Sequence, residues 1–213
     1  MSTGISNVCL EASTDVYLPV YARRRNLPGG SDSWTYVSAD STTQTAVYKS
    51  SDALQMIVAF RGTKTKADRA QWTDLAKLPD DQISRYQDGL AHVERLRRRH
   101  PAIRNWILTG HSMGALIARY VAAKTHTKAI VFAEPAIPTK SPPPNPVPTE
   151  SYMVQGDIVG KLGGSTHDRI PLYKRPGSAC QKLAKAGPFW KSWAGVSAHS
   201  IDTYRACMKE HER

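Results

Sequence analysis

A serine between two glycines, at the junction of a strand-like and a helix-like run, is the feature that most constrains this chain. Trp106-Ile107-Leu108 is a short apolar run typical of a buried strand, and it leads into Gly110-His111-Ser112-Met113-Gly114. Apolar side chains then recur at helical spacing, at Leu116, Ile117, Tyr120 and Val121. The pattern predicts a strand, a sharp turn that carries Ser112, and a helix with one buried face.

A serine on such a turn is typical of the nucleophile elbow of α/β-hydrolases. Gly110 and Gly114 leave room for the tight turn, and the helix N-terminus directs backbone N–H groups to the space above Ser112. The competing interpretation is a chance occurrence, because Gly-x-Ser-x-Gly alone is common. The flanking strand and helix favour a nucleophile.

A serine nucleophile needs a general base, and the base needs an orienting acid. Of the histidines after Ser112, His126 ends the elbow helix and lies too near along the chain, and His211 lies in a polar terminal segment. His199 follows a loop of small residues and precedes the last helix-like segment, so we expect it to be the base. His167, in a polar turn, remains the alternative.

Asp157 is the first candidate for the acid. It comes shortly after the apolar strand Tyr152-Met153-Val154, which would place its carboxylate at the carboxyl edge of a sheet. Asp168 is the competitor, and Glu134 is the third candidate.

Several blocks resemble the class 3 lipases, the fungal triacylglycerol lipase family. They occur in the family's order from about Leu54 to His199. The blocks are Ile57-Val58-Ala59-Phe60-Arg61-Gly62-Thr63, Gln71-Trp72-Thr73-Asp74-Leu75, Asp88-Gly89, the elbow with its histidine before the serine, Glu134-Pro135, Gly156-Asp157-Ile158-Val159 and Ala198-His199-Ser200.

The resemblance implies an α/β fold with a mostly parallel central sheet flanked by helices. It also implies Ser112, Asp157 and His199 as a catalytic triad, with Thr63 and the Met113 backbone N–H as the oxyanion hole. His111 in the elbow, and Trp72 in a lid over residues 64–78, would lie at the substrate. A tryptophan packed in the core is the equally supported alternative for Trp72. These assignments make the chain an esterase or lipase that acts through an acyl-serine intermediate.

The spacing between Trp72 and Asp74 is one residue shorter than in the family, and Glu134 stands where the family has a glutamine. Three further departures bear on the site. Ala115 stands where the family usually has a second glycine, and alanine is small enough to cause little harm. Residues 160–164 replace a proline after the acid motif, so that loop is expected to be looser. The chain is also short for the family, which suggests a more open acyl site.

The length of 213 residues suits one α/β core, and we expect residues 1–213 to form a single domain. Seven prolines between Pro135 and Pro148 resemble a linker in composition. Because Ser112 precedes this segment while Asp157 and His199 follow it, we interpret it as a stiff loop at the rim of the site.

Compartment is left open by the sequence. No run of eighteen apolar residues predicts a membrane span, and the first seven residues lack the pattern of a secretory signal, so we expect a cytoplasmic protein or a secreted mature form. Cys180 and Cys207 would pair in a secreted protein, but with Cys9 they make an odd count, and three reduced thiols are favoured. No metal-ligand spacing is present, and neither a metal nor another cofactor is expected.

The formal net charge of +11 would attract an anionic surface. For any single basic cluster, a solvated surface that aids solubility is the favoured interpretation. Nucleic acid would be attracted equally well, but no nucleic-acid motif is present, so a peripheral contact with an anionic membrane is favoured. The alternative to a lipid esterase is a catalytically silent basic scaffold that binds anionic membranes or nucleic acid. A monomer acting on a lipid ester is the expected form, with the choice among triacylglycerol, phospholipid and small soluble esters left open.

Overall fold

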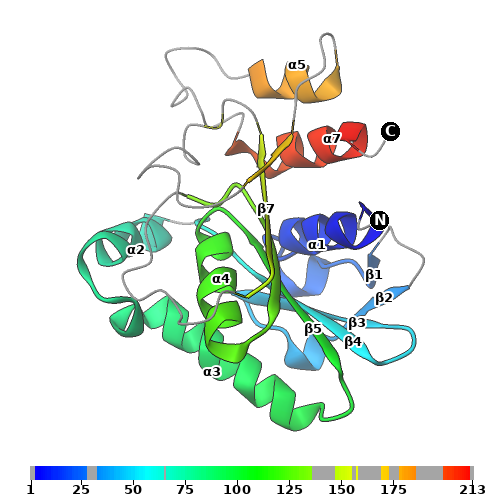
Figure 1. The fold of residues 1–213 in the computed structure, drawn as a ribbon, viewed down its shortest axis with the longest axis vertical. Coiled ribbons are helices and arrows are strands. Elements are labelled where there is room, and N and C mark those ends of the chain that lie inside the picture. The colour runs from blue at the N-terminus through cyan, green and yellow to red at the C-terminus, as the bar shows by residue number, and fades with distance from the viewer. Residues whose placement is uncertain are drawn as a thin grey trace.

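The computed structural model describes residues 3–27, 33–64, 66–135, 147–154, 157, 169–172, 178–185 and 199–211. Within these ranges the strands form one central sheet, in which spatial order follows chain order (Figure 1). The strands are β1 Asn26–Leu27, β2 Trp34–Tyr36, β3 Thr45–Ser50, β4 Gln55–Phe60, β5 Asn105–His111, β6 Lys128–Phe132, β7 Thr149–Val154 and β8 Ile170–Leu172.

The sheet is antiparallel in its first half and parallel in its second. β1 to β4 pair antiparallel, whereas β4 to β8 pair parallel. Parallel neighbours require crossover connections, and between β4 and β6 these contain helices. The carboxyl ends of β4, β5, β6 and β7 therefore meet at one edge. The predicted α/β-hydrolase-like class is confirmed, with a mixed sheet in place of a mostly parallel one.

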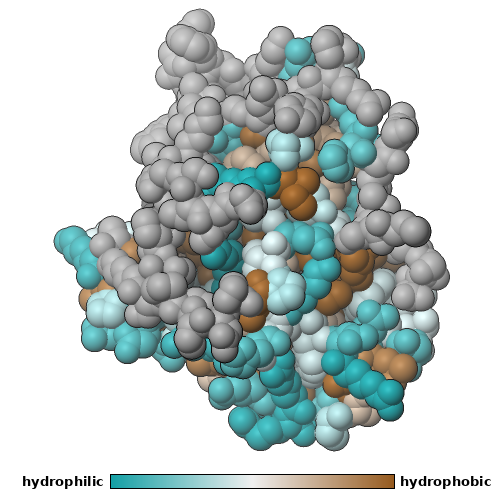
Figure 2. Space-filling model, in the orientation of Figure 1, coloured by the Kyte–Doolittle hydropathy of each residue, from teal (hydrophilic) through white to brown (hydrophobic). Residues whose placement is uncertain are grey.

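Helices cover both faces of the sheet. They are α1 Thr3–Asp15, α2 Lys66–Lys77, α3 Ser84–Arg99, α4 Met113–Thr125, α5 Ala179–Lys185 and α7 Ile201–His211, with 3₁₀ turns at Val20–Ala22, Ser38–Asp40 and Asp80–Gln82. In Figure 1, α1 and α7 lie on one side of the central strands and α3 and α4 on the other. Figure 2 shows hydrophilic residues gathered over the lower part of this view, where α3 lies in Figure 1.

The two faces of the sheet belong to separate apolar cores. Along β4, Ile57 packs into the core beneath α1 and α7, while its neighbour Val58 packs into the core beneath α3 and α4. Successive strand residues point to opposite faces, so a strand buried on both faces reads as a continuous apolar run. This explains why the segment 56–60 is wholly buried.

The apolar periodicity of the sequence predicts strands near 45–50, 54–60, 105–109 and 128–133 and helices near 67–78 and 83–99, and these are confirmed within two residues at each end. The same pattern predicts a strand over residues 33–39, which is shorter in the structure and passes into a 3₁₀ turn. The helix α1 is not predicted by this periodicity. Its serines obscure its burial, since Ser6 and Ser13 are fully buried and Ser13 Oγ lies 3.0 Å from Thr109 Oγ1.

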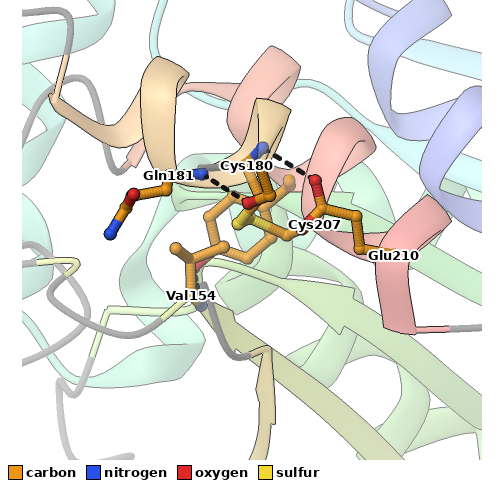
Figure 3. Close-up of a disulfide and its surroundings, with 7 residues drawn as sticks. Val154, Cys180, Gln181, Cys207 and Glu210 are labelled. Carbon is orange, nitrogen blue, oxygen red and sulfur yellow. Dashed lines mark hydrogen bonds between the residues drawn. A yellow bond between two sulfur atoms is a disulfide. The ribbon is translucent and has the colours of Figure 1, made fainter. Parts of the chain in front are cut away.

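The expectation of three reduced thiols is wrong. Cys180 and Cys207 form a disulfide that joins α5 to α7, with their Cα atoms 4.7 Å apart, and Cys9 is a buried free cysteine (Figure 3). In Figure 3, Glu210 reaches back along α7 and its Oε1 accepts a hydrogen bond from the backbone N–H of Cys180 at 3.0 Å. The odd number of cysteines concealed this pair, because the third thiol lies apart in α1.

Across the described ranges, no helix combines the length and the apolarity needed to cross a membrane. The proline-rich loop predicted at the rim of the site falls largely on residues 136–146, which lie outside the described residues.

Candidate active site

Ser112 occupies the junction between β5 and α4. Its backbone has φ 59° and ψ −129°, a combination that residues other than glycine rarely adopt and that costs about 1–3 kcal/mol. The backbone N–H of Ser112 donates to the Phe132 carbonyl at 3.1 Å, which ties the turn to β6. The predicted strand–turn–helix with the serine on a strained turn is present.

The two glycines of the turn are required by close backbone contacts. A Cβ at Gly110 would collide with the backbone of Gly114, and a Cβ at Gly114 would collide with the carbonyl oxygen of Phe60. The turn therefore folds against the end of β4, and this contact brings the segment after β4 next to Ser112.

The structure brings Ser112, His199 and Asp157 together. His199 Nε2 lies 2.8 Å from Ser112 Oγ, and His199 Nδ1 lies 2.9 Å from Asp157 Oδ2 and 3.1 Å from Asp157 Oδ1. Asp157 is 1% exposed and follows β7, while His199 directly precedes α7. Because a carboxylate only accepts, Nδ1 carries the proton in this arrangement, and Nε2 is free to accept the serine proton.

Tyr204 supports the carboxylate of Asp157 from α7. Its hydroxyl donates to Asp157 Oδ2 at 2.8 Å and accepts the backbone N–H of Val154 at 3.1 Å. Burial, and then the charge of Asp157, raise the pKa of Tyr204 well above its usual value, so it remains a donor. The sequence analysis missed this residue, whose only signal is its place one turn into the helix that follows His199.

His111 lies behind His199 instead of facing open space. The His111 side chain is buried, with Nε2 2.8 Å from the carbonyl oxygen of His199 and Nδ1 3.3 Å from the Tyr17 hydroxyl. Burial, and then the nearby His199, lower the pKa of His111 to about 3, so the ring is neutral. A carbonyl oxygen only accepts; therefore Nε2 carries the proton and Nδ1 accepts from Tyr17. The described contacts of the His111 ring are thus with Tyr17 and with the backbone of the predicted base, and its contact with substrate stays a prediction.

The turn after β4 lies alongside Ser112. A Cβ at Gly62 would approach the Ser112 Cβ to 3.4 Å and the His111 carbonyl oxygen to 2.5 Å, and it would collide with the Tyr17 hydroxyl. Thr63 follows this glycine, and Met113 is the first residue of α4. Of the two residues predicted to form the oxyanion hole, Met113 therefore directly follows Ser112, and Thr63 directly follows the glycine that lies against it.

A buried carboxylate holds the turn after β4 in place. Asp68, at the start of α2, accepts the Lys64 backbone N–H at 2.9 Å and pairs with Arg61 at 3.3 Å. Arg85, from α3, donates to the Arg61 carbonyl at 2.6 Å. These contacts fix the backbone from Arg61 to Lys64, which is the arrangement that a preorganised oxyanion donor needs.

Trp72 contacts the predicted oxyanion turn. Its indole N–H donates to Thr63 Oγ1 at 3.0 Å, and its ring packs against the core beneath α3 and α4. Trp72 is partly buried, which agrees with the alternative of a tryptophan packed on the core, and its predicted contact with substrate in a lid stays a prediction. Trp72 therefore braces Thr63, and the Thr63 hydroxyl accepts a hydrogen bond from Trp72.

The remaining candidates for acid and base do not reach this cluster within the described residues. Glu134 is buried and bonds Arg119 at 2.5 Å and Ser151 at 3.2 Å. His126 is the left-handed C-cap of α4, and His211 ends α7. His167 and Asp168 fall outside the described part of the chain. A search of the described residues for a cluster of His, Cys, Asp and Glu side chains able to hold a metal ion finds none.

Comparison with known proteins gives structural resemblance alone. No family model matches the chain, and no curated protein matches its sequence. The similar solved structures include fungal lipases. A Penicillium expansum triacylglycerol lipase is 12% identical over 79% of this chain and 78% of its own, with a TM-score of 0.43. A Yarrowia lipolytica lipase is 12% identical over 80% and 78%, with a TM-score of 0.46.

A Rhizomucor miehei lipase, solved as a propeptide complex, is 12% identical with a TM-score of 0.40. That match covers 61% of this chain and about half, 51%, of the lipase chain. Identities this low leave the function to be argued from the site.

Proposed function

We propose that this chain is a serine hydrolase that cleaves carboxylic ester bonds of lipids through an acyl-serine intermediate. The observation that carries the proposal is the continuous hydrogen-bonded series from Ser112 Oγ through His199 to Asp157. Nucleophile, base and orienting acid within hydrogen-bond distance are the geometry that activates a serine hydroxyl. We further propose that residues 1–213 act as one domain, since these three residues come from distant parts of the chain.

The reaction follows from the donors and acceptors in place. Ser112 Oγ attacks the ester carbonyl carbon while His199 Nε2 takes the hydroxyl proton. The negative charge that develops on the carbonyl oxygen is stabilised by the backbone N–H groups of Thr63 and Met113. His199 then returns the proton to the leaving alcohol, and a water molecule releases the acid by the same steps. Asp157 holds the imidazole tautomer and stabilises its charged form, with Tyr204 donating to the carboxylate.

A labelled fluorophosphonate probe tests the proposal, because only an activated serine reacts with it. We expect labelling of the unmodified chain and none of Ser112→Ala. Ester turnover should fall by about 10³-fold or more in Ser112→Ala and in His199→Ala, since members of a triad act as a unit. Asp157→Asn is expected to lower turnover through the wrong imidazole tautomer. Ser38→Ala, at an exposed position of the 3₁₀ turn Ser38–Asp40, is the matched control.

The alternative of a silent basic scaffold predicts no labelling and no turnover with any ester. His167→Ala and Asp168→Asn test the competing base and acid, and loss of turnover in them with retention in His199→Ala and Asp157→Asn would contradict the assignment. A direct comparison of hydrolysis on triacylglycerol, phospholipid and a short soluble ester identifies the substrate class within lipid esters. The proposed chemistry uses side-chain and backbone groups of the chain alone, without a cofactor.

A further inference from the structure

The connection between α1 and β1 presents an apolar run to solvent. Leu18-Pro19-Val20-Tyr21-Ala22 carries no charge, none of its residues is buried, and four of the five are exposed. Tyr21 is 92% exposed and Leu18 is 41% exposed. Among the described residues, the other exposed large apolar side chains are Leu54, which directly precedes β4, and Leu183 in α5. We name residues 18–22 the apolar loop.

The apolar loop begins beside the candidate active site. Tyr17, which precedes it, places its hydroxyl against His111 and Gly62, next to the proposed nucleophile. Lys64, one residue after the proposed oxyanion donor Thr63, donates from Nζ to the Tyr17 carbonyl at 2.5 Å. A surface that receives the apolar loop would therefore also meet the segment that flanks Ser112.

The base of the apolar loop is firmly held. Arg23 is buried and donates to the carbonyl oxygens of Thr45, at 2.7 Å, and Val16, at 3.3 Å. Arg24 pairs with Asp15 at 2.8 Å and Glu11 at 2.7 Å. The apolar side chains are thus held outward by a fixed backbone, and ordering them on a partner costs little conformational entropy.

Cations flank the apolar loop. Arg25 follows it and is exposed, and Lys64 beside Tyr17 is exposed. The whole chain carries a formal net charge of +11. Apolar side chains and a tyrosine ring suit the boundary between water and lipid, and nearby cations attract anionic headgroups. Trp72 does not provide such a surface, because its ring packs on the core and its N–H is bonded to Thr63.

We propose that the apolar loop, together with Arg25 and Lys64, is the surface by which this chain docks on an anionic lipid bilayer. Docking in this orientation brings the lipid surface to the segment beside Ser112. The charge complementarity between these exposed cations and anionic headgroups selects the bilayer as the occupant. That docking delivers a lipid substrate to Ser112 rests on the proposed function, whereas binding to the bilayer does not depend on hydrolysis.

Vesicle sedimentation in the Ser112→Ala background tests the docking without hydrolysis. Partition is measured on phosphatidylcholine vesicles and on vesicles that also contain phosphatidylserine. We expect preferential binding to the anionic vesicles at about 0.1 M salt and loss of that preference near 1 M, where the screening length falls from about 10 Å to about 3 Å. The double variant Leu18→Ser/Tyr21→Ser should lower the partition coefficient by about tenfold or more.

Leu54→Ser is the matched control. Leu54 is 39% exposed, a fraction similar to that of Leu18. It directly precedes β4 and therefore lies at the opposite end of that strand from Gly62. Its partition coefficient should equal that of the Ser112→Ala parent. Because Tyr21 is almost fully exposed, Tyr21→Ser alone should leave the melting curve by circular dichroism unchanged, and it serves as the second variant if the double variant fails to fold.

Three results would overturn the proposal. The first is equal binding of the loop variants and their parent to anionic vesicles. The second is equal binding of the parent to both vesicle types at low salt. The third is vesicle-free self-association that the loop variants abolish, which would assign the loop to a second copy of the chain. If the unmodified chain binds anionic vesicles but hydrolyses no ester, the result would count against the proposed function alone.

Discussion

The imidazole Nε2 atom of His111 lies 2.8 Å from the backbone carbonyl oxygen of His199. The two rings lie side by side, with centroids 5.0 Å apart. His111 is the last residue of β5 and directly precedes Ser112. The end of β5 therefore positions Ser112 and also binds the backbone of His199, whose ring contacts Ser112. This bond connects segments 88 residues apart and fixes where the proposed base lies relative to the proposed nucleophile.

Replacement of His111 tests this positioning role. His111→Leu removes the donor to the His199 carbonyl, and a lost partner at a buried polar group costs about 1–3 kcal/mol. If the cost falls on the transition state, kcat drops by about 5- to 150-fold while KM changes little. His111→Gln, which keeps an N–H donor, should recover part of kcat. A rise in KM at unchanged kcat, measured with a short soluble ester, would instead show a substrate contact of His111.

The lowered pKa of His111 also predicts how folding stability depends on pH. The folded state holds this ring neutral down to about pH 3, whereas an unfolded chain protonates it near its ordinary value of 6.5. The unfolded state therefore binds more protons between about pH 6.5 and pH 3, and the stability present above 6.5 is lost as pH falls through this window. Each pH unit well inside the window costs up to about 1.4 kcal/mol.

Urea unfolding at several pH values measures this effect. The free energy of unfolding of His111→Gln should fall less steeply with acid than that of the unmodified chain. Parallel slopes for the two proteins would show that His111 is protonated in the folded state as readily as in the unfolded chain.

The hydrogen bond between Trp72 and Thr63 predicts matched effects of two variants. Thr63→Val removes the acceptor and Trp72→Phe removes the donor, and each keeps most of the side-chain volume. Loss of an oxyanion donor typically raises the activation free energy by about 2.7–4 kcal/mol, which lowers kcat by about 10²–10³-fold. Because both variants retain the Thr63 backbone N–H, each should lower kcat by a smaller factor. Thr63→Ser should be nearly neutral. A loss in Thr63→Val far larger than in Trp72→Phe would indicate that the hydroxyl contacts the oxyanion.

The disulfide between Cys180 and Cys207 predicts a redox-dependent stability. The two cysteines are 27 positions apart in the sequence. For a loop of this length, the lower entropy of the cross-linked unfolded chain stabilises the folded state by about 3–4 kcal/mol. A thiol reductant should lower the melting temperature of the unmodified chain by several degrees, with no further effect on Cys180→Ser/Cys207→Ser. Cys9→Ala is the control, and it should respond to reductant like the unmodified chain. An unchanged melting temperature under full reduction would mean that α5 contributes little to stability.

The local pattern around Ser112 was sufficient to predict β5, the turn and α4. These elements depend on residues close in sequence, namely two glycines and an apolar period that switches from strand to helix. The positions of His199 and Asp157 were predicted from chain order and from their places after a small-residue loop and a strand. Their distances from each other depend on how β7 and α7 pack, which the sequence analysis did not address.

The contacts that support the candidate site were not predictable in the same way. Tyr17 and Tyr204 lie 94 and 47 residues from the groups they bond, His111 and Asp157. No local period or motif marks a side chain whose partner is that distant. For Trp72, the sequence supports a lid contact and a core position equally, and packing against the core decides its partial burial. Long-range polar contacts, together with the helix α1, are the main features that the sequence does not predict.

The Glu11 carboxylate, in α1, receives Arg24 on one oxygen and Arg205, in α7, on the other. The partner residues Glu11 and Arg205 are 194 positions apart in the chain. Contacts of such large sequence separation form late, because the entropy of closing the intervening loop must be overcome first. During refolding, Ser112 should therefore reach its turn before α7 carries His199 to it. An intermediate that already has the sheet would hold Ser112 without its proposed base, so recovery of the proposed ester hydrolysis should lag behind recovery of β-structure.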